Sequence, residues 1–96
     1  MKKIILQYWE ESERGWGVRP DGCSLHLTLD DHKKYINSVY ESRKHDNFVP
    51  DEYDRVVGNP LEVMIKEDLY NLINKSMRLF EYEMNNLMKL EELILI

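Results

Sequence analysis

Within residues 20–40, PDGCSLHLTLDDHKKYINSVY, the hydrophobic period of the chain changes from two to nearly four. From Cys23 to Thr28 every second residue is apolar, which is typical of a strand with one buried face. From Thr28 onward the apolar residues recur at helical spacing. Thr28 can cap the first turn, and Asp31 takes the acidic position of a capping box. The stretch therefore predicts a strand that leads directly into a helix ending near Lys44.

The segments before this stretch predict a hairpin. Residues 2–9 alternate between two faces and predict a first strand, and Pro20-Asp21-Gly22 predicts a tight turn before the second. The sheet is expected to cover the face of the helix that carries its larger side chains: His32, Tyr35, Ile36, Val39 and Tyr40.

The second half of the chain predicts one more strand and one more helix. Residues 45–60 contain two prolines and a glycine, so a long loop is expected there, followed by a strand at 61–66. Residues 67–96 contain neither glycine nor proline and predict one long helix. The expected fold is α+β in the order ββαβα, with a small, mainly antiparallel three-stranded sheet. Residues 1–66 would form the body, and residues 67–96 would belong to the same single domain.

The predicted terminal helix is too long for its own domain to cover. About 29 residues make a rod of about 43 Å, whereas a globule of this size is about 32 Å across. The apolar stripe continues to the last residue. We therefore expect a homodimer, with a helical seam formed by Phe80, Met84, Leu87, Leu90 and Ile94.

Composition limits the class of protein. The 96 residues carry a net charge of −5, and all of it lies in residues 49–96. Such a half disfavours direct binding to nucleic acid and suits either a basic protein partner or a solvated helix face. No apolar run is long enough to span a membrane. The single cysteine, Cys23, excludes an internal disulfide framework and a cysteine-rich zinc site, so a cytoplasmic location is expected.

Residues 12–22, SERGWGVRPDG, form the most unusual segment. Arg14 and Arg19 flank Trp16, and glycines on both sides of this tryptophan let a ligand approach the backbone. With Trp9 as a second flat wall, the segment predicts a surface for a protein partner or for a nucleotide-like planar anion. The alternative is a hairpin whose tryptophan only covers the core. The spacing does not match a phosphate-binding fingerprint.

Other polar residues suggest weaker hypotheses. Ser24 and His26 share one strand face, which leaves a small hydrolase open, with Asp21 to orient the histidine. His26 and His32 with nearby acids resemble a metal-ligand set, but their spacing does not require one, and no metal or other cofactor is expected. Tyr53 and Arg55 lie in an acidic stretch that suits either a protein contact or a solvated turn.

The segments GWG, PDG-x-SLHL and VPDEY, within residues 4–72, resemble a group of small proteins of bacteriophages and other mobile elements. The resemblance implies no defined activity and no catalytic residues. It implies a counter-defence factor that inhibits a host protein by occlusion, in the host cytoplasm. The sequence therefore predicts a non-enzymatic binding protein, with a nucleotide-binding module as the alternative and a hydrolase third.

Overall fold

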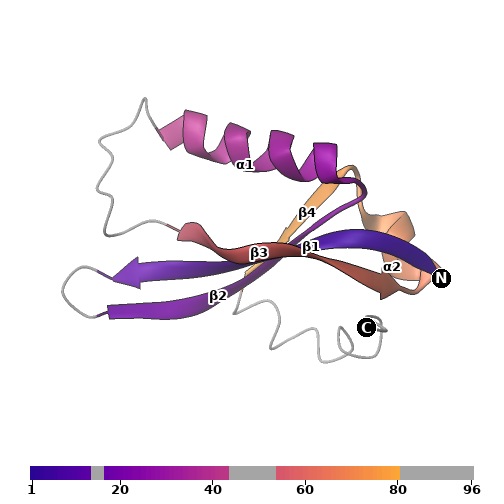
Figure 1. The fold of residues 1–96 in the computed structure, drawn as a ribbon, viewed down its shortest axis with the longest axis horizontal. Helices are drawn as coiled ribbons and strands as arrows, with labels where there is room; N and C mark the ends of the chain where they lie inside the picture. Colours follow the sequence, from indigo (N-terminus) through magenta and orange to yellow (C-terminus); the bar gives the residue numbers. More distant parts are fainter. Residues whose placement is uncertain (14–16, 44–53, 81–96) are drawn as a thin grey trace.

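The computed structural model describes residues 1–13, 17–43 and 54–80. Helix α1 covers one face of a four-stranded antiparallel sheet with the strand order β3-β1-β2-β4 (Figure 1). The α+β class and the antiparallel sheet are confirmed, but the prediction of three strands in the order ββαβα is wrong. The elements are β1 (Lys2–Glu13), β2 (Gly17–His26), α1 (Leu29–Arg43), β3 (Asp54–Ile65), α2 (Glu67–Leu72) and β4 (Ser76–Leu79).

The predicted start of α1 is confirmed. The Asp31 amide donates a hydrogen bond of 3.1 Å to Thr28 Oγ1, and the Thr28 hydroxyl donates one of 2.9 Å to the Asp31 carboxylate. The helix turns its predicted face to the sheet, where the rings of Tyr35 and Tyr40 lie 6.2 and 6.5 Å from that of Trp9. Local capping and periodicity therefore set this element.

The predicted turn at Pro20-Asp21-Gly22 is wrong, because these residues form a β-bulge inside one continuous strand. Tyr8 pairs with Cys23 and Glu10 pairs with Pro20, so β2 advances three residues while β1 advances two. Gly22 has a φ of 76°, a left-handed conformation that glycine adopts at little cost. Glycine and proline mark a turn and a bulge equally well, so only strand pairing separates the two.

The predicted loop at residues 45–60 is also wrong in part, since residues 54–60 belong to β3 and residues 44–53 lie outside the described part of the chain. Leu6 pairs with Leu61 and Tyr8 pairs with Val57, so a second bulge lies at residues 58–60. The Gln7 side-chain amide donates to the carbonyls of Val57 and Gly58 at 3.1 and 3.2 Å. An edge strand tolerates proline at such a bulge, because no neighbour requires its missing N–H.

The prediction of one helix over residues 67–96 is wrong. Helix α2 ends at Leu72, Ile73 is extended, and Lys75 takes a φ of 63° before β4 begins at Ser76. Strand β4 pairs with the part of β2 from Cys23 to His26. The backbone N–H and C=O groups of β4 bond to the open edge of β2. This pairing outweighs the local helical preference of the segment. Residues 81–96 lie outside the described chain.

The apolar core lies mainly on the sheet face opposite α1. The even-numbered residues of β1 and the odd-numbered residues of β2 and β3 meet there, and α2 and its C-cap add Leu69 and Ile73. Cys23 is buried in this cluster, as the strand alternation predicted. The other face carries an unusual number of polar groups. The core consists of Ile4, Leu6, Cys23, Leu25, Val63, Ile65, Leu69, Ile73 and Leu79.

The bulge in β3 generates a prediction about Gly58. Its φ is 72°, and an added Cβ would meet no atom within 4 Å. Gly58→Ala should therefore lower the free energy of unfolding by about 1–2 kcal/mol through backbone conformation alone. Denaturant unfolding measures the change, with the neighbouring exposed Asn59→Ala expected to stay within about 0.5 kcal/mol. An equal decrease in the free energy of unfolding in the two variants would contradict a left-handed conformation at Gly58.

Candidate functional site

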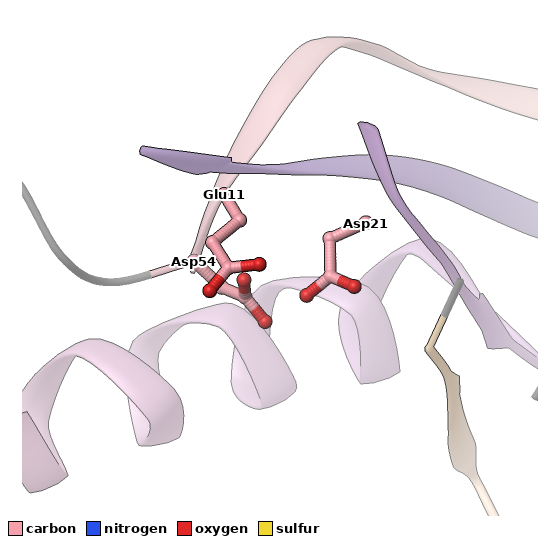
Figure 2. A group of neighbouring side chains, drawn as sticks. All are labelled: Glu11, Asp21 and Asp54. Atoms are coloured by element: carbon pink, nitrogen blue, oxygen red, sulfur yellow. The ribbon is translucent and has the colours of Figure 1, made fainter. Parts of the chain in front are cut away.

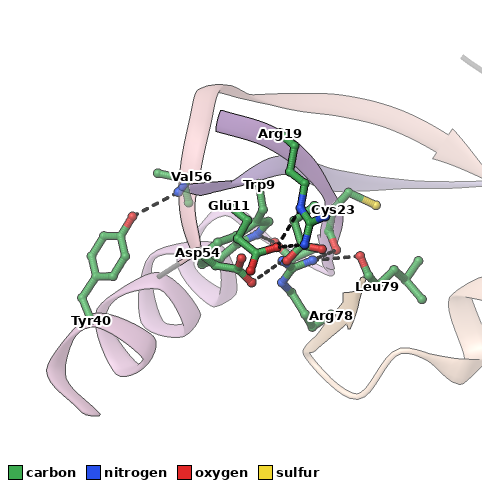
Figure 3. Close-up of polar contacts among 11 residues, drawn as sticks. Trp9, Glu11, Arg19, Cys23, Tyr40, Asp54, Val56, Arg78 and Leu79 are labelled. Atoms are coloured by element: carbon green, nitrogen blue, oxygen red, sulfur yellow. Dashed lines mark hydrogen bonds and ion pairs between the residues drawn. The ribbon is translucent and has the colours of Figure 1, made fainter. Parts of the chain in front are cut away.

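The guanidinium of Arg78 joins three strands on the polar face of the sheet (Figure 3). Its side chain is only 10% exposed. One terminal nitrogen donates to the carbonyls of Cys23 and Leu79 at 3.1 and 2.8 Å, and the other donates to the Asp54 carboxylate at 3.0 Å. The guanidinium carbon also lies 4.8 Å from the Trp9 ring and 4.3 Å from the Phe80 ring. Arg78 is therefore fixed by hydrogen bonds, charge and two aromatic faces.

Three acids surround this arginine. Glu11, Asp21 and Asp54 come from β1, β2 and β3, and each presents a carboxylate oxygen within 4.8 Å of the others (Figure 2). We call them the carboxylate cluster. Arg78 reaches Asp21 at 3.5 Å, and Glu11 accepts two hydrogen bonds from Arg19. These acids could in principle ligate a cation, but guanidinium groups already contact all three, so we assign no metal.

The cluster changes the protonation of Asp54. Burial raises the pKa of its carboxyl to about 6, helped by a hydrogen bond to Asp21 and by the charge of Asp21. Arg78 opposes the rise but does not cancel it. The folded protein thus holds a proton at Asp54 that an ordinary carboxyl releases two pH units lower. The stability that this proton adds is present at pH 4 and is lost as the pH rises through 6.

Ser24 and His26, the predicted hydrolase pair, do meet. The Ser24 hydroxyl lies 2.7 Å from His26 Nε2, and Trp9 Nε1 donates to the same hydroxyl at 2.8 Å. His26 Nδ1 lies 2.7 Å from the Ser76 hydroxyl, which donates in turn to the carbonyl of Asp31. Because Trp9 can only donate and Asp31 O can only accept, the chain requires Nδ1–H and a bare Nε2 on His26. We call this chain the relay.

The relay keeps His26 neutral and inaccessible. Ser24 and His26 are both 0% exposed. Burial lowers the pKa of His26 to about 4, with a smaller contribution from His32 and with Asp31 acting the other way. Ser76, rather than the predicted Asp21, orients the imidazole. Both ring nitrogens of His26 are hydrogen-bonded to hydroxyls, so neither has a free lone pair for the metal site that was considered between His26 and His32.

His32 reaches the same region from α1. Its Nε2 donates to Gln7 Oε1 at 2.9 Å, an orientation fixed because the Gln7 amide nitrogen faces backbone carbonyls. Its ring centroid lies 5.0 Å from that of His26, at a near-perpendicular angle. The buried Nδ1 of His32 has no hydrogen-bond partner among the described residues. Burial, and then the charge of Lys33, lowers the pKa of His32.

A groove with a volume of about 570 Å³ lies on the hairpin formed by β1 and β2, with β3 at one side. Its apolar wall is exposed: Tyr8, Val18 and Val57 are 46%, 51% and 40% accessible. Single exposed apolar residues are normal, but a set of them around one depression suits a contact. We call it the hairpin groove, lined by Tyr8, Trp9, Glu10, Val18, Arg19, Pro20, Gly22 and Val57.

The structure brings only some of the predicted binding residues together. Arg19 lines the hairpin groove and bonds Glu11, and Arg55 bonds Glu10 at 2.6 Å. Trp9 is 1% exposed, so its predicted role as an open flat wall is wrong. Three further predicted binding residues lie outside the described chain: Arg14, Trp16 and Tyr53.

The long helix that was predicted to carry the dimer seam is absent from the described residues up to Phe80. Phe80 follows β4 directly and stacks on Arg78. The homodimer itself stays a prediction. The other seam residues, Met84, Leu87, Leu90 and Ile94, lie outside the described residues.

Sequence reasoning missed Arg78 and Gln7, the two residues that organise the polar face. Arg78 lay within the predicted long helix, and its partner Asp54, 24 residues away, lay in the predicted loop. Gln7 offered a signal, because it stands among the large apolar residues of the first strand. A buried amide in such a strand indicates a polar partner across the interface.

Comparison with known proteins adds no assignment. No family model matches the chain, and no curated protein or solved structure is significantly similar to it. In the described part of the chain, no helix has the length and hydrophobicity needed to cross a membrane.

The raised pKa of Asp54 generates a prediction about pH. Asn in this position can accept from Arg78 and donate to Asp21, as the protonated acid does, but it never acquires a charge. Asp54→Asn should therefore raise the melting temperature more at pH 7.5 than at pH 4.5. Asp54→Ala removes the same charge but cannot form these hydrogen bonds, so it should not raise the melting temperature. The same effect of Asp54→Asn at both pH values would contradict the shared proton.

The geometry of Arg78 generates a second prediction. Lysine keeps the charge but cannot reach two carbonyls and two carboxylates in one plane. Arg78→Lys should lower the free energy of unfolding by at least about 2 kcal/mol, because hydrogen bonds of a buried charge are lost. Arg19→Lys provides the matched control, since this exposed ion pair is expected to contribute less than about 1 kcal/mol. Urea unfolding of both variants decides whether burial makes the difference.

Proposed function

We propose that this chain is a non-enzymatic binding protein that covers a surface of a partner protein, and that the hairpin groove is its contact surface. The resemblance to phage and mobile-element proteins makes a host protein the expected partner and inhibition by occlusion the expected effect. The proposal depends on the groove more than on any other feature.

The observation that carries the proposal is the exposed apolar wall of Tyr8, Val18 and Val57. Fully burying a side chain of this kind contributes about 1.5–3 kcal/mol. Around the wall, Glu10 pairs with Arg55, which gives the apolar centre a polar rim. An apolar centre with a charged rim is the usual anatomy of a protein interface.

The arrangement of Ser24 and His26 argues against a hydrolase. A nucleophile must touch its substrate, and both side chains are fully buried. The polar atoms of the pair are already occupied within the relay by Trp9 and Ser76. The relay therefore supports a structural role for the pair.

A nucleotide-like planar anion remains the second candidate ligand, and one observation favours it. The groove volume of about 570 Å³ falls in the range of small-molecule sites, and Arg19 and Tyr8 are both among its lining residues. Such a ligand would have to compete with Glu11 for the guanidinium. Because this competition reduces the gain from an anion, we place a protein partner first.

The test uses two groove variants and one matched control. Val18→Asp and Val57→Asp each place a charge on the apolar wall, whereas Leu72→Asp does so on α2, where Leu72 is 72% exposed. Tagged wild-type protein should retain a specific partner from host lysate. Both groove variants should weaken that retention at least tenfold, and the control should keep it.

Circular dichroism spectra of the three variants should match that of the wild-type protein if the fold is intact. Retention that survives both groove substitutions would refute the groove as the contact surface. A melting shift with nucleotides in wild type, lost in Val18→Asp, would instead favour the small-ligand candidate.

A further inference from the structure

Helix α1 rests on the sheet through rings and polar groups more than through aliphatic side chains. Tyr35 and Tyr40 contact Trp9, and His32 contacts Gln7 and His26. Two imidazoles thus face each other across the interface between helix and sheet. Both are neutral in the geometry described above.

We propose that His26 and His32 form an acid-sensitive latch, and that protonation of this pair releases α1 and exposes Trp9, Ser24 and His26. The proposal goes beyond binding at the hairpin groove and does not depend on it. It follows from what a second proton would meet on each ring.

A second proton on His26 would sit on Nε2, directly against the Ser24 hydroxyl. That hydroxyl already accepts from Trp9 and donates its own hydrogen to Nε2. If the Ser24 hydroxyl had to accept from both Trp9 Nε1 and His26 Nε2, its own hydrogen would have no acceptor. A buried hydroxyl or imidazolium that lacks a hydrogen-bond partner destabilises the closed form, and exposure to water supplies the missing partner.

A second proton on His32 would sit on Nδ1. No described residue offers an acceptor to this buried nitrogen. The two charged rings would then lie 5.0 Å apart between centroids. Movement of α1 removes both costs, because His32 travels with the helix into water and away from His26.

The neighbouring charges do not prevent this. From α1, Asp31 favours the charged form of His26, whereas Lys33 disfavours the charged form of His32. Tyr35 adds a ring 5.3 Å from His26. The strands contribute only neutral groups within hydrogen-bonding distance of the two imidazoles: Gln7 from β1, Ser24 from β2 and Ser76 from β4.

The sign follows from the direction of the shifts. Burial lowers the pKa of both histidines in the closed form, and release of α1 would return each toward its ordinary value. The released form therefore binds more protons below about pH 6.5, so acid favours release. With the pKa of His26 at about 4 when closed, release at pH 5 should be about tenfold to thirtyfold more favourable than at pH 7.5.

Amide hydrogen exchange on the full chain tests the latch. After correction for intrinsic rates, the opening constants of α1 amides should rise about tenfold to thirtyfold from pH 7.5 to pH 5.0. We expect amides of β1 and β2 to open only with the whole fold, where proton uptake by Asp54 offsets much of the histidine effect. Their opening constants should therefore change about threefold or less.

Three variants make the result specific. His32→Gln retains a donor for Gln7 and should reduce the acid effect on α1, and His26→Gln should remove most of the rest. His45→Gln, which changes the third histidine of the chain, should leave the acid effect intact. If His26→Gln does not fold, the wild-type exchange and His32→Gln still decide. An equal change in α1 and sheet amides, or an unchanged acid effect in His32→Gln, would overturn the latch.

Discussion

A guanidinium that is nine-tenths buried must be fully compensated, and the compensation of Arg78 organises the polar face of this protein. The planar group bonds two carbonyls on one side and reaches two carboxylates on the other, between the rings of Trp9 and Phe80. The distant partners come from three other strands: Trp9 from β1, Asp21 and Cys23 from β2, and Asp54 from β3. Strand β4 is therefore held against β2 by more than its four residue pairs, and Asp54 is drawn from β3 to the same point.

The two faces of the sheet solve different physical problems. One face buries aliphatic side chains, whereas the face under α1 buries a hydrogen-bonded relay and an excess of acids. Burial favours the neutral form of any titratable group, so it raises the pKa of Asp54 and lowers that of His26. These shifts act on stability in opposite directions over the same pH range. Between about pH 4 and 6 the shift at Asp54 therefore opposes the shift at His26 in its effect on stability.

The outer half of the hairpin differs from the inner half because of the two bulges. Gly22 and Gly58 both adopt positive φ and interrupt the registers of β2 and β3 on opposite sides of β1. Bulges bend a strand and increase its twist, which separates this region from the packed core. Tyr8, Val18 and Val57 remain exposed there. The depression therefore lies where the two registers are interrupted, outside the packed core.

Elements whose signals are local could be predicted from the amino-acid sequence. The cap at Thr28 and the change of period predicted α1 and the end of β2 from Cys23 onward, and alternation predicted that Ser24 and His26 share a face. Three features follow from long-range contacts instead: residues 20–22 and 58–60 are bulges, residues 76–79 form a strand, and Ser24 and His26 are buried under α1. The local helical preference of a short segment such as Ser76–Leu79 is small, so pairing with the open edge of β2 and the ion pair with the distant Asp54 outweigh it. Pairing and charge compensation across tens of residues leave no periodic trace in the chain.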